Sequence, residues 1–215
     1  MEIRNQPIQS VVGRELDDQP GINSKKNRSD LMVLRYMAHR LQTTLQLQDI
    51  ASAFVPATRY YLRERYERVH RVVLYKPPEA FLLKDPLFVG FVSQKQKHLS
   101  STLLNNVSEV DMQLLSELVH NPGLLSYSSL QLRHGDWFNL VIFSDEAAKK
   151  HIKNSHTHAY AAHQLSPHYY EWIRLHQGII AGGLVTGDFV LQKTAYYAFR
   201  DTAPSPLFRQ VTYNA

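Results

Sequence analysis

The sequence predicts a mixed α+β fold, in which strands and amphipathic helices alternate over most of the chain. Three segments, 86–92, 137–143 and 189–199, are rich in β-branched and aromatic residues, as strands are. Two others, 108–120 and 146–165, carry apolar residues at helical spacing. With 44% hydrophobic and 20% charged residues, the chain has enough apolar side chains to bury a core.

The amino-terminal part of the chain differs from the rest. Residues 1–30 are polar, contain prolines and glycines, and are expected to form a flexible arm. A helix is expected to start at about Asp30, which suits the N-cap position. Its apolar stripe comprises Leu31, Leu34, Met37, Ala38 and Leu41. Residues 57–73 predict a second helix, or a helix followed by a strand. A double proline marks a boundary near residue 80. The expected parts are therefore an arm (1–30), a helical extension (31–80) and an α+β domain (81–215).

The elements expected after this boundary follow one another closely. Residues 86–92 form the first strand, and Ser108 is expected to cap the helix over 108–120. The apolar stripe of that helix comprises Met112, Leu115 and Val119. The segment "NPG" ends it. Residues 124–132 and 137–143 alternate on either side of "HGD", which predicts a β-hairpin.

The last elements complete a regular order. Ser144 or Asp145 is expected to cap the second helix, which Pro167 ends. Residues 169–177 are ambiguous: their aromatic and β-branched content favours a strand, while a helical stripe fits nearly as well. Residues 189–199 form the final strand. The order strand, helix, strand, strand, helix, strand is the ferredoxin-like βαββαβ arrangement, here preceded by an α-helical extension.

This arrangement puts both helices on one face of the sheet and leaves the opposite face apolar and uncovered. Such a face has to be buried. A second sheet from another copy of the chain would do this most simply, so a homodimer is expected. The amino-terminal helices are the alternative cover.

Composition excludes several classes of function. The chain has no cysteine, which excludes disulfides, thiolate metal sites and a cysteine nucleophile. No apolar run approaches the ~18 residues that span a bilayer, and the amino terminus has no apolar signal core, so a cytoplasmic protein is expected. The net charge of +5 is concentrated in residues 59–76, interpreted as a solvated helix face. Because no nucleic-acid-binding motif accompanies it, nucleic acid is not an expected partner.

Residues 123–163 resemble the dimeric α+β barrel superfamily, in particular its antibiotic-biosynthesis-monooxygenase-like branch. The resemblance is carried by the glycine-led strand "GLLSYSSLQL" and by a W-x-N-L-x-x-F strand from Trp137 to Phe143. It continues in a helix of the form A-x-x-x-H-x-x-x-S-x-x-H from Ala147 to His158. The resemblance implies an enzyme that transforms an apolar or aromatic small molecule between the sheet and the second helix, most simply by cofactor-independent oxidation.

The same superfamily implies an alternative with haem. In its haem-degrading branch a helix histidine ligates the iron, and His163 or His158 would take that role here. The first expected strand, however, lacks the asparagine of that branch, and His151 stands where a tryptophan is expected. No cofactor is therefore expected, with haem as the alternative.

Six of the eleven histidines lie within residues 151–176. On a continuous helix His151 and His158 share one face, and His156 and His163 share another, each pair seven residues apart. Two imidazoles on one metal would need a spacing of three or four residues, so no metal site is expected. The neighbouring apolar positions are Ala148, Ile152, Ala159 and Ala162. They place His158 and His151 towards the sheet, whereas the family motif favours His163.

The expected site combines these histidines with strand residues. His158 is the candidate base, and Asn139 and His151 complete the catalytic candidates, because oxidation without a cofactor needs a base and oxyanion donors in an apolar site. The substrate- or cofactor-binding candidates are Trp137, Tyr127, Trp172, Tyr196 and His163. Two further functions stay open: a haem- or tetrapyrrole-binding protein with one axial histidine, and a non-catalytic binding or assembly module whose amino-terminal helices engage a partner.

Overall fold

A computed structural model describes residues 21–47, 54–132, 135–185, 187–199 and 206–213. They form an α+β structure around one eight-stranded sheet with the order β1-β2-β4-β5-β3-β6-β7-β8. Every neighbouring pair is antiparallel. The strands are β1 (Thr58–Arg63), β2 (Val69–Leu74), β3 (Leu87–Lys95), β4 (Leu124–Gln131), β5 (Asp136–Phe143), β6 (Tyr170–Ala181), β7 (Asp188–Ala198) and β8 (Leu207–Thr212).

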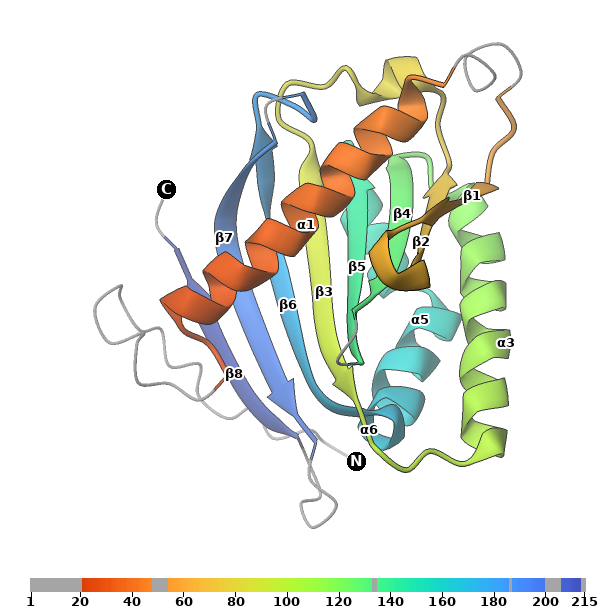
Figure 1. Cartoon of the computed structure of the whole chain (residues 1–215), viewed down its shortest axis with the longest axis vertical. Coiled ribbons are helices and arrows are strands. Elements are labelled where there is room, and N and C mark those ends of the chain that lie inside the picture. The colour runs from red at the N-terminus through yellow and green to blue at the C-terminus, as the bar shows by residue number, and fades with distance from the viewer. Residues whose placement is uncertain (1–20, 48–53, 133–134, 186, 200–205, 214–215) are drawn as a thin grey trace.

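Helices lie on both faces of this sheet. The long helix α1 runs diagonally across the front of the sheet (Figure 1), whereas buried residues of α3 and α4 pack against the other face. We call these two sides the α1 face and the α3 face. The helices are α1 (Ser24–Leu45), α3 (Ser101–Glu117), α4 (Glu146–Lys153), α5 (His156–Tyr160) and α6 (Ser166–Tyr169). None in the described part of the chain is long and apolar enough to cross a membrane.

Helix α1 begins six residues before the expected start at Asp30 and therefore takes in the end of the segment predicted to be an arm. The side chain of Asn23 accepts a hydrogen bond from the backbone N–H of Lys26, which makes Asn23 the N-cap. Asp30 is buried instead and turns its carboxylate towards the sheet. The expected apolar stripe is largely confirmed, since Leu34, Met37, Ala38 and Leu41 are buried. Residues 1–20 of the predicted arm lie outside the described residues.

Of the helix, or helix followed by a strand, predicted over residues 57–73, the helical part is wrong, because this segment forms the strands β1 and β2. Exposure alternates along β1, as expected for a half-buried edge strand. Strand β2 pairs with β4, so the sheet continues across the boundary that the sequence placed near residue 80. The arginines and tyrosines that indicated a helical face belong to a hairpin, and tertiary pairing outweighs local propensity there.

Both helices of the α3 face differ from their predicted extents. Helix α3 begins at Ser101, because the hydroxyl of Ser100 accepts from the backbone N–H of Leu103 and caps it well before Ser108. The second helix is broken after α4, where the hydroxyl of Ser155 accepts from the N–H of His158 and caps a new helix, α5. A π-helical turn (Ala161–Leu165) leads from α5 to α6. Residues 170–181 form a strand, as favoured.

Helix α1 of the same chain covers the face for which a second sheet was expected. Its buried stripe packs on strand residues that include Val72, Phe88, Leu140, Ile142 and Ile180. The approach is close: a Cβ added to Gly90 on β3 would lie 2.4 Å from a methyl carbon of Leu34. The α1 face is therefore filled without a partner, and the expected homodimer, which stays a prediction, would need another surface.

Candidate functional site

The α3 face is apolar at one end and polar at the other. At one end Leu115, Leu118, Leu124, Phe143 and Ala148 form a buried cluster. Towards the other end the cross-strand register sets polar and aromatic side chains in rows, since alternate residues of a strand share a face. One row runs Arg71, Ser129, Asn139, Phe91 and Leu175. Tyr127 lies in the row on one side of it and Trp137 in the row on the other.

We call Arg71, Tyr127, Ser129, Asn139 and Trp137 the α3-face site. Tyr127, Asn139 and Trp137 come from β4 and β5, the predicted hairpin, and the structure brings these three sequence candidates together. Each keeps partial exposure, although helices lie on this side of the sheet. The site therefore combines aromatic surface with polar groups that solvent or a small molecule can reach.

Arg71 is the fixed cation of the α3-face site. Its guanidinium donates two hydrogen bonds to the carboxylate of Asp111 on α3, at 2.6 and 3.0 Å, and one to the hydroxyl of Ser129 at 3.2 Å. Burial opposes the charge, but the hydrogen bonds and charges of Asp111 and Tyr127 together outweigh burial and raise the pKa of Arg71. The guanidinium also lies over the ring of Tyr127, 5.5 Å from its centroid. This bidentate pair holds Arg71 and Tyr127 in place.

Two tyrosines on this side of the sheet, Tyr127 and Tyr170, keep their protons at neutral pH. Burial raises the pKa of Tyr127, and the carboxylate of Asp111 adds to the effect. Burial also raises the pKa of Tyr170, whose ring packs edge-on against Phe91 with the ring centroids 5.4 Å apart. Both phenols are therefore hydrogen-bond donors in this part of the molecule rather than bases.

Asn139 presents an amide donor. Its side-chain oxygen accepts a hydrogen bond from the indole N–H of Trp137 at 2.9 Å, which fixes the orientation of both groups. Among the described residues, none accepts a hydrogen bond from its amide nitrogen. On the other side of the indole, the Lys95 ammonium lies 4.8 Å from the ring centroid of Trp137. Asn139 is thus anchored through its oxygen, while its N–H groups remain able to bind a ligand.

The predicted histidines do not join this site through any described interaction. His151 and His163 are exposed, and the break between α4 and α5 removes the shared face expected for His151 and His158. His158 is half-buried; burial lowers its pKa, and the charges of His163 and Lys153 lower it further. The His158 ring is neutral at pH 7, but the side chains that act on it lie in α4 and in the turn after α5, not in the α3-face site. Within the described residues no three His, Cys, Asp or Glu side chains are grouped to hold a metal ion.

Trp172 and Tyr196, also predicted to line the pocket, lie on the opposite α1 face. The indole of Trp172 donates to the side-chain oxygen of Gln94 at 2.7 Å, and the guanidinium of Arg174 stacks on it at 4.3 Å. The ring centroid of Tyr196 is 6.3 Å from that of Trp172. The strand was recognised, but the alternation of β6 puts its even-numbered side chains on the α1 face, where Trp172 lies with Arg174 and His176. The structure therefore separates the predicted binding residues into two groups.

A buried charged network on the α1 face was missed by sequence reasoning. The Asp30 carboxylate on α1 accepts two hydrogen bonds from Arg174, at 2.7 and 3.0 Å, and lies 2.9 Å from Nε2 of His176. Nδ1 of His176 lies 3.0 Å from the hydroxyl of Thr194. Burial raises the pKa of Asp30, but the hydrogen bonds from His176 and Arg174 outweigh it and lower the pKa overall. The sequence offered one indication of this network: Arg174 and His176 are polar residues at alternate positions of an otherwise largely apolar strand.

A carboxylate, an imidazole and a hydroxyl follow one another in this network, as they do in the catalytic triad of a hydrolase. Unlike a catalytic triad, however, these groups are buried away from substrate. His176 and Thr194 are both 0% exposed, so no substrate reaches the hydroxyl. The network joins α1 to β6 and β7 instead, and we assign it a structural role.

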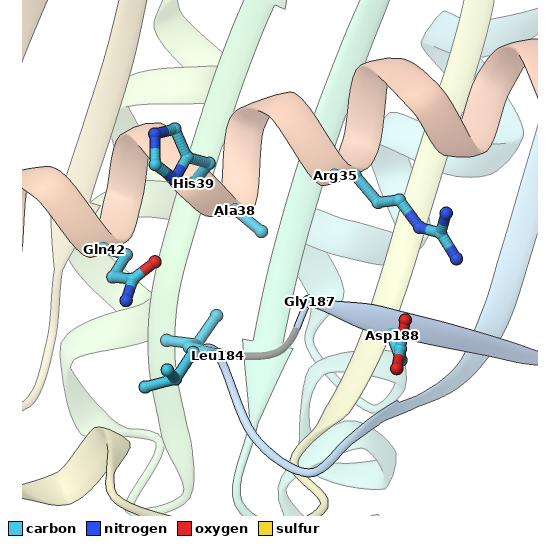
Figure 2. A pocket seen from close by; sticks show the side chains of 8 residues that line it. Arg35, Ala38, His39, Gln42, Leu184, Gly187 and Asp188 are labelled. Atoms are coloured by element: carbon cyan, nitrogen blue, oxygen red, sulfur yellow. The ribbon is translucent and has the colours of Figure 1, made fainter.

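Two cavities lie on the α1 face. One, of about 210 Å³, separates α1 from the connection between β6 and β7; Figure 2 shows Arg35, His39 and Gln42 of α1 beside Leu184 and Asp188. The other, of about 580 Å³, lies between α1, the β1–β2 connection and the end of β4. Neither is lined by a residue that the sequence singled out as a site candidate.

Comparison with protein-family models gave no match, and neither did comparison with curated proteins. Among solved structures, protein SO0527 from Shewanella oneidensis is similar at 12% identity, over 45% of this chain and 92% of that one, with a TM-score of 0.38. PA3566 from Pseudomonas aeruginosa is similar at 15% identity, over 43% of this chain and 90% of that one, with a TM-score of 0.35. Likeness of this size carries no conclusion about fold or function.

Proposed function

We propose that this chain is a small-molecule enzyme of the ferredoxin-like, dimeric α+β barrel type, which binds an aromatic substrate bearing an ionisable oxygen at the α3-face site. The order of elements from β3 to β6 supports the fold proposal. Strand β3 lies between β5 and β6, and β5 lies between β3 and β4, with α3 and the α4–α6 segment as the two crossovers. This order supports a split βαβ arrangement for this part of the chain.

The observation that carries the proposal is the pairing of Asn139 with Trp137. The indole offers an aromatic surface, and the adjacent amide offers N–H groups for which no described residue is an acceptor. Tyr127 adds a neutral phenol beside the fixed positive charge of Arg71. Donors that are held in place before the ligand arrives stabilise a phenolate or a developing oxyanion at low reorganisation cost.

The reaction we propose is oxidation of an electron-rich phenol by dioxygen, without a cofactor. One oxygen atom enters the ring as a new carbonyl, the other leaves as water, and the phenol supplies the electrons and both hydrogens while it becomes a quinone. Because His158 makes no described contact with the α3-face site, the substrate has to ionise readily. The protein then needs to bind the phenolate rather than to generate it.

A binding titration tests this proposal first. We expect 1-naphthol to quench the fluorescence of Trp137 saturably, and naphthalene, which lacks the oxygen, to bind at least tenfold more weakly. Asn139→Ala should weaken 1-naphthol binding by roughly tenfold, the loss of about one hydrogen bond to the naphthol oxygen. Gln131→Ala, an exposed neighbour on β4, is the matched control and should change it less than twofold. Equal binding of naphthol and naphthalene, or no effect of Asn139→Ala, contradicts the proposal.

Two further measurements separate the reaction from binding and from the haem alternative. Dioxygen uptake with 1,5-dihydroxynaphthalene should exceed the uncatalysed rate and fall in Asn139→Ala; binding without uptake would reduce the protein to a binding module. A haemin titration followed at the Soret band should show no saturable complex. Tight binding lost in His158→Ala or His163→Ala would overturn the cofactor-free reaction.

A further inference from the structure

The larger cavity on the α1 face has the make-up of a second ligand site. Its volume of about 580 Å³ lies within the range of small-molecule sites, ~300–1,000 Å³. We call it the α1–hairpin cavity, since it is bounded by α1 and by the connection between β1 and β2. It opens on the opposite face of the sheet from Asn139 and shares no lining residue with the α3-face site.

One wall of the α1–hairpin cavity is apolar. It is formed by Met32 and Val33 of α1 and by Leu130 and Leu132 at the end of β4. Met32 is 61% exposed, although it stands beside other apolar side chains that are half-buried or buried. A cluster of this kind that faces solvent loses the burial energy that a bound apolar group would restore.

The opposite wall carries positive charge. Arg65 and Arg68 line it, and Glu64 is the acidic residue among the lining residues. The carboxylate of Glu64 is already engaged: it accepts hydrogen bonds from the hydroxyl of Tyr36 and from Nε of Arg40, the latter at 2.9 Å. The cavity wall is therefore left with two arginines that Glu64 does not neutralise.

Arg65 and Arg68 differ in the contacts that their side chains make with the rest of the protein. Arg68 donates from Nε to the backbone oxygen of Arg65 at 3.0 Å and lies over the ring of Tyr66. The side chain of Arg65 has no hydrogen-bond or ion-pair partner within the described residues. A guanidinium without a protein partner, beside an apolar wall, is suited to an anionic group on an apolar ligand.

The backbone between these arginines is held in an uncommon conformation. Tyr66 and Glu67 have φ angles of +63° and +56°, in the left-handed region that favours glycine. The backbone hydrogen bond from Glu64 N–H to Arg68 oxygen, at 2.8 Å, closes the connection around them. Non-glycine residues in this region are strained, and such conformations concentrate at ligand sites.

We propose that the α1–hairpin cavity binds an amphipathic carboxylate, with its anionic head between Arg65 and Arg68 and its apolar body against Met32, Val33 and Leu130. The ligand is a free small molecule of the fatty-acid or aryl-carboxylate kind. A neutral apolar ligand would leave the arginines unused, and a cation would be repelled by them. A nucleic acid would need a chain of cations along its backbone, whereas this wall has two beside an apolar surface.

Calorimetric titration of the full chain with dodecanoate, below its aggregation concentration, tests the proposal. We expect saturable one-to-one binding, with dodecanol at least tenfold weaker and dodecyltrimethylammonium not bound. Arg65→Gln should weaken dodecanoate roughly tenfold and bring its affinity close to that of dodecanol, because one charge-assisted pair is lost. Arg63→Gln, an exposed arginine of β1 outside the cavity, is the matched control and should change affinity less than twofold.

A second variant tests the apolar wall without threatening the fold. Met32→Glu replaces an exposed side chain and should abolish dodecanoate binding while the urea midpoint is unchanged. Asn139→Ala should leave dodecanoate binding unchanged, so this site and the α3-face site succeed or fail separately. Equal affinity for dodecanoate and dodecanol, full affinity in Arg65→Gln, or binding to anionic vesicles but not to free dodecanoate would overturn the proposal.

Discussion

The two faces of the sheet use their polar side chains in opposite ways. On the α1 face Asp30, Arg174, His176 and Thr194 are buried and bind one another. On the α3 face Arg71 and Asn139 are each fixed through one set of atoms and keep partial exposure. The first arrangement closes a face of the fold, and the second leaves hydrogen-bond donors available for the ligand that we propose.

The strongest test of the structural role of the buried network is to remove its central charge, the carboxylate of Asp30. Asp30→Ala leaves Arg174 buried without its carboxylate, and we expect the free energy of unfolding to fall by about 3–5 kcal/mol. Urea unfolding measures it. Glu109→Ala, an exposed carboxylate on α3, should change stability by less than about 0.5 kcal/mol.

A double variant shows whether that loss belongs to the pair. Arg174→Met in the Asp30→Ala background removes the uncompensated cation, and should recover part of the stability lost in the single variant. If the two losses simply add, Asp30 and Arg174 do not act as a pair, and the structural role given to the network is wrong.

A second test uses acid, to which the α1 face should be sensitive. His70 on β2 is 0% exposed; burial lowers its pKa to about 4, although the carboxylate of Glu64 acts in the opposite direction. The ordinary pKa of histidine is 6.5. Below that pH His70 is protonated in the unfolded chain but stays neutral in the folded chain. Stability is therefore fully present above pH 6.5 and falls as the pH drops towards 4, by about 3 kcal/mol for this group.

Urea titrations at several pH values measure this loss, and two variants assign it. His70→Leu should flatten the curve between pH 6.5 and 4. His158→Gln removes a histidine whose pKa burial lowers in the same direction, so the part of the slope that this variant keeps and His70→Leu loses belongs to His70. An unchanged slope in His70→Leu would show that His70 titrates normally in the folded protein.

The close packing of α1 gives a third prediction of intermediate size. Gly90→Ala puts a methyl group 2.4 Å from a carbon of Leu34, and we expect overpacking to cost about 1–3 kcal/mol. Leu34→Ala alone should cost about 2–5 kcal/mol through the cavity it leaves. In the double variant the new methyl group partly fills that cavity, so the combined loss should be smaller than the sum. Additive losses would mean that α1 does not approach β3 this closely.

Sequence reasoning succeeded where the information was local. The hairpin of β4 and β5 was recognised from alternation around a turn, and alternation alone then put Trp137, Asn139 and Tyr127 on one face. It failed where contacts between distant parts of the chain decide the structure. Asp30 and Arg174 are 144 residues apart, and no local pattern around Asp30 indicates its partner. Trp172 was assigned to the wrong face because the register of β6 depends on β3, including a bulge at Gln94 and Lys95.

The prediction for the histidine-rich helix was wrong for a related reason. The spacing of His151 and His158 was interpreted on one continuous helix, but the hydroxyl of Ser155 caps a new helix between them. A serine in a helical pattern is compatible both with continuation and with a cap, and only the surrounding packing decides between the two. Arg71 was not recognised as a site residue, because its segment was interpreted as a solvated helix rather than as a strand that pairs with β4.

Asn139→Ala is expected to have a small effect on stability and a large effect on naphthol binding. Asn139→Ala removes the acceptor of the Trp137 indole, but both side chains are half-exposed and water can replace it, so the loss of stability should stay below about 1 kcal/mol. The same variant should weaken 1-naphthol binding roughly tenfold. Asp30→Ala, in the range where the chain remains folded, should show the reverse: a large loss of stability and unchanged naphthol affinity. If Asn139→Ala instead lowers stability by as much as Asp30→Ala does, the polar groups of the two faces play the same structural part, and the α3-face site loses its claim to a ligand.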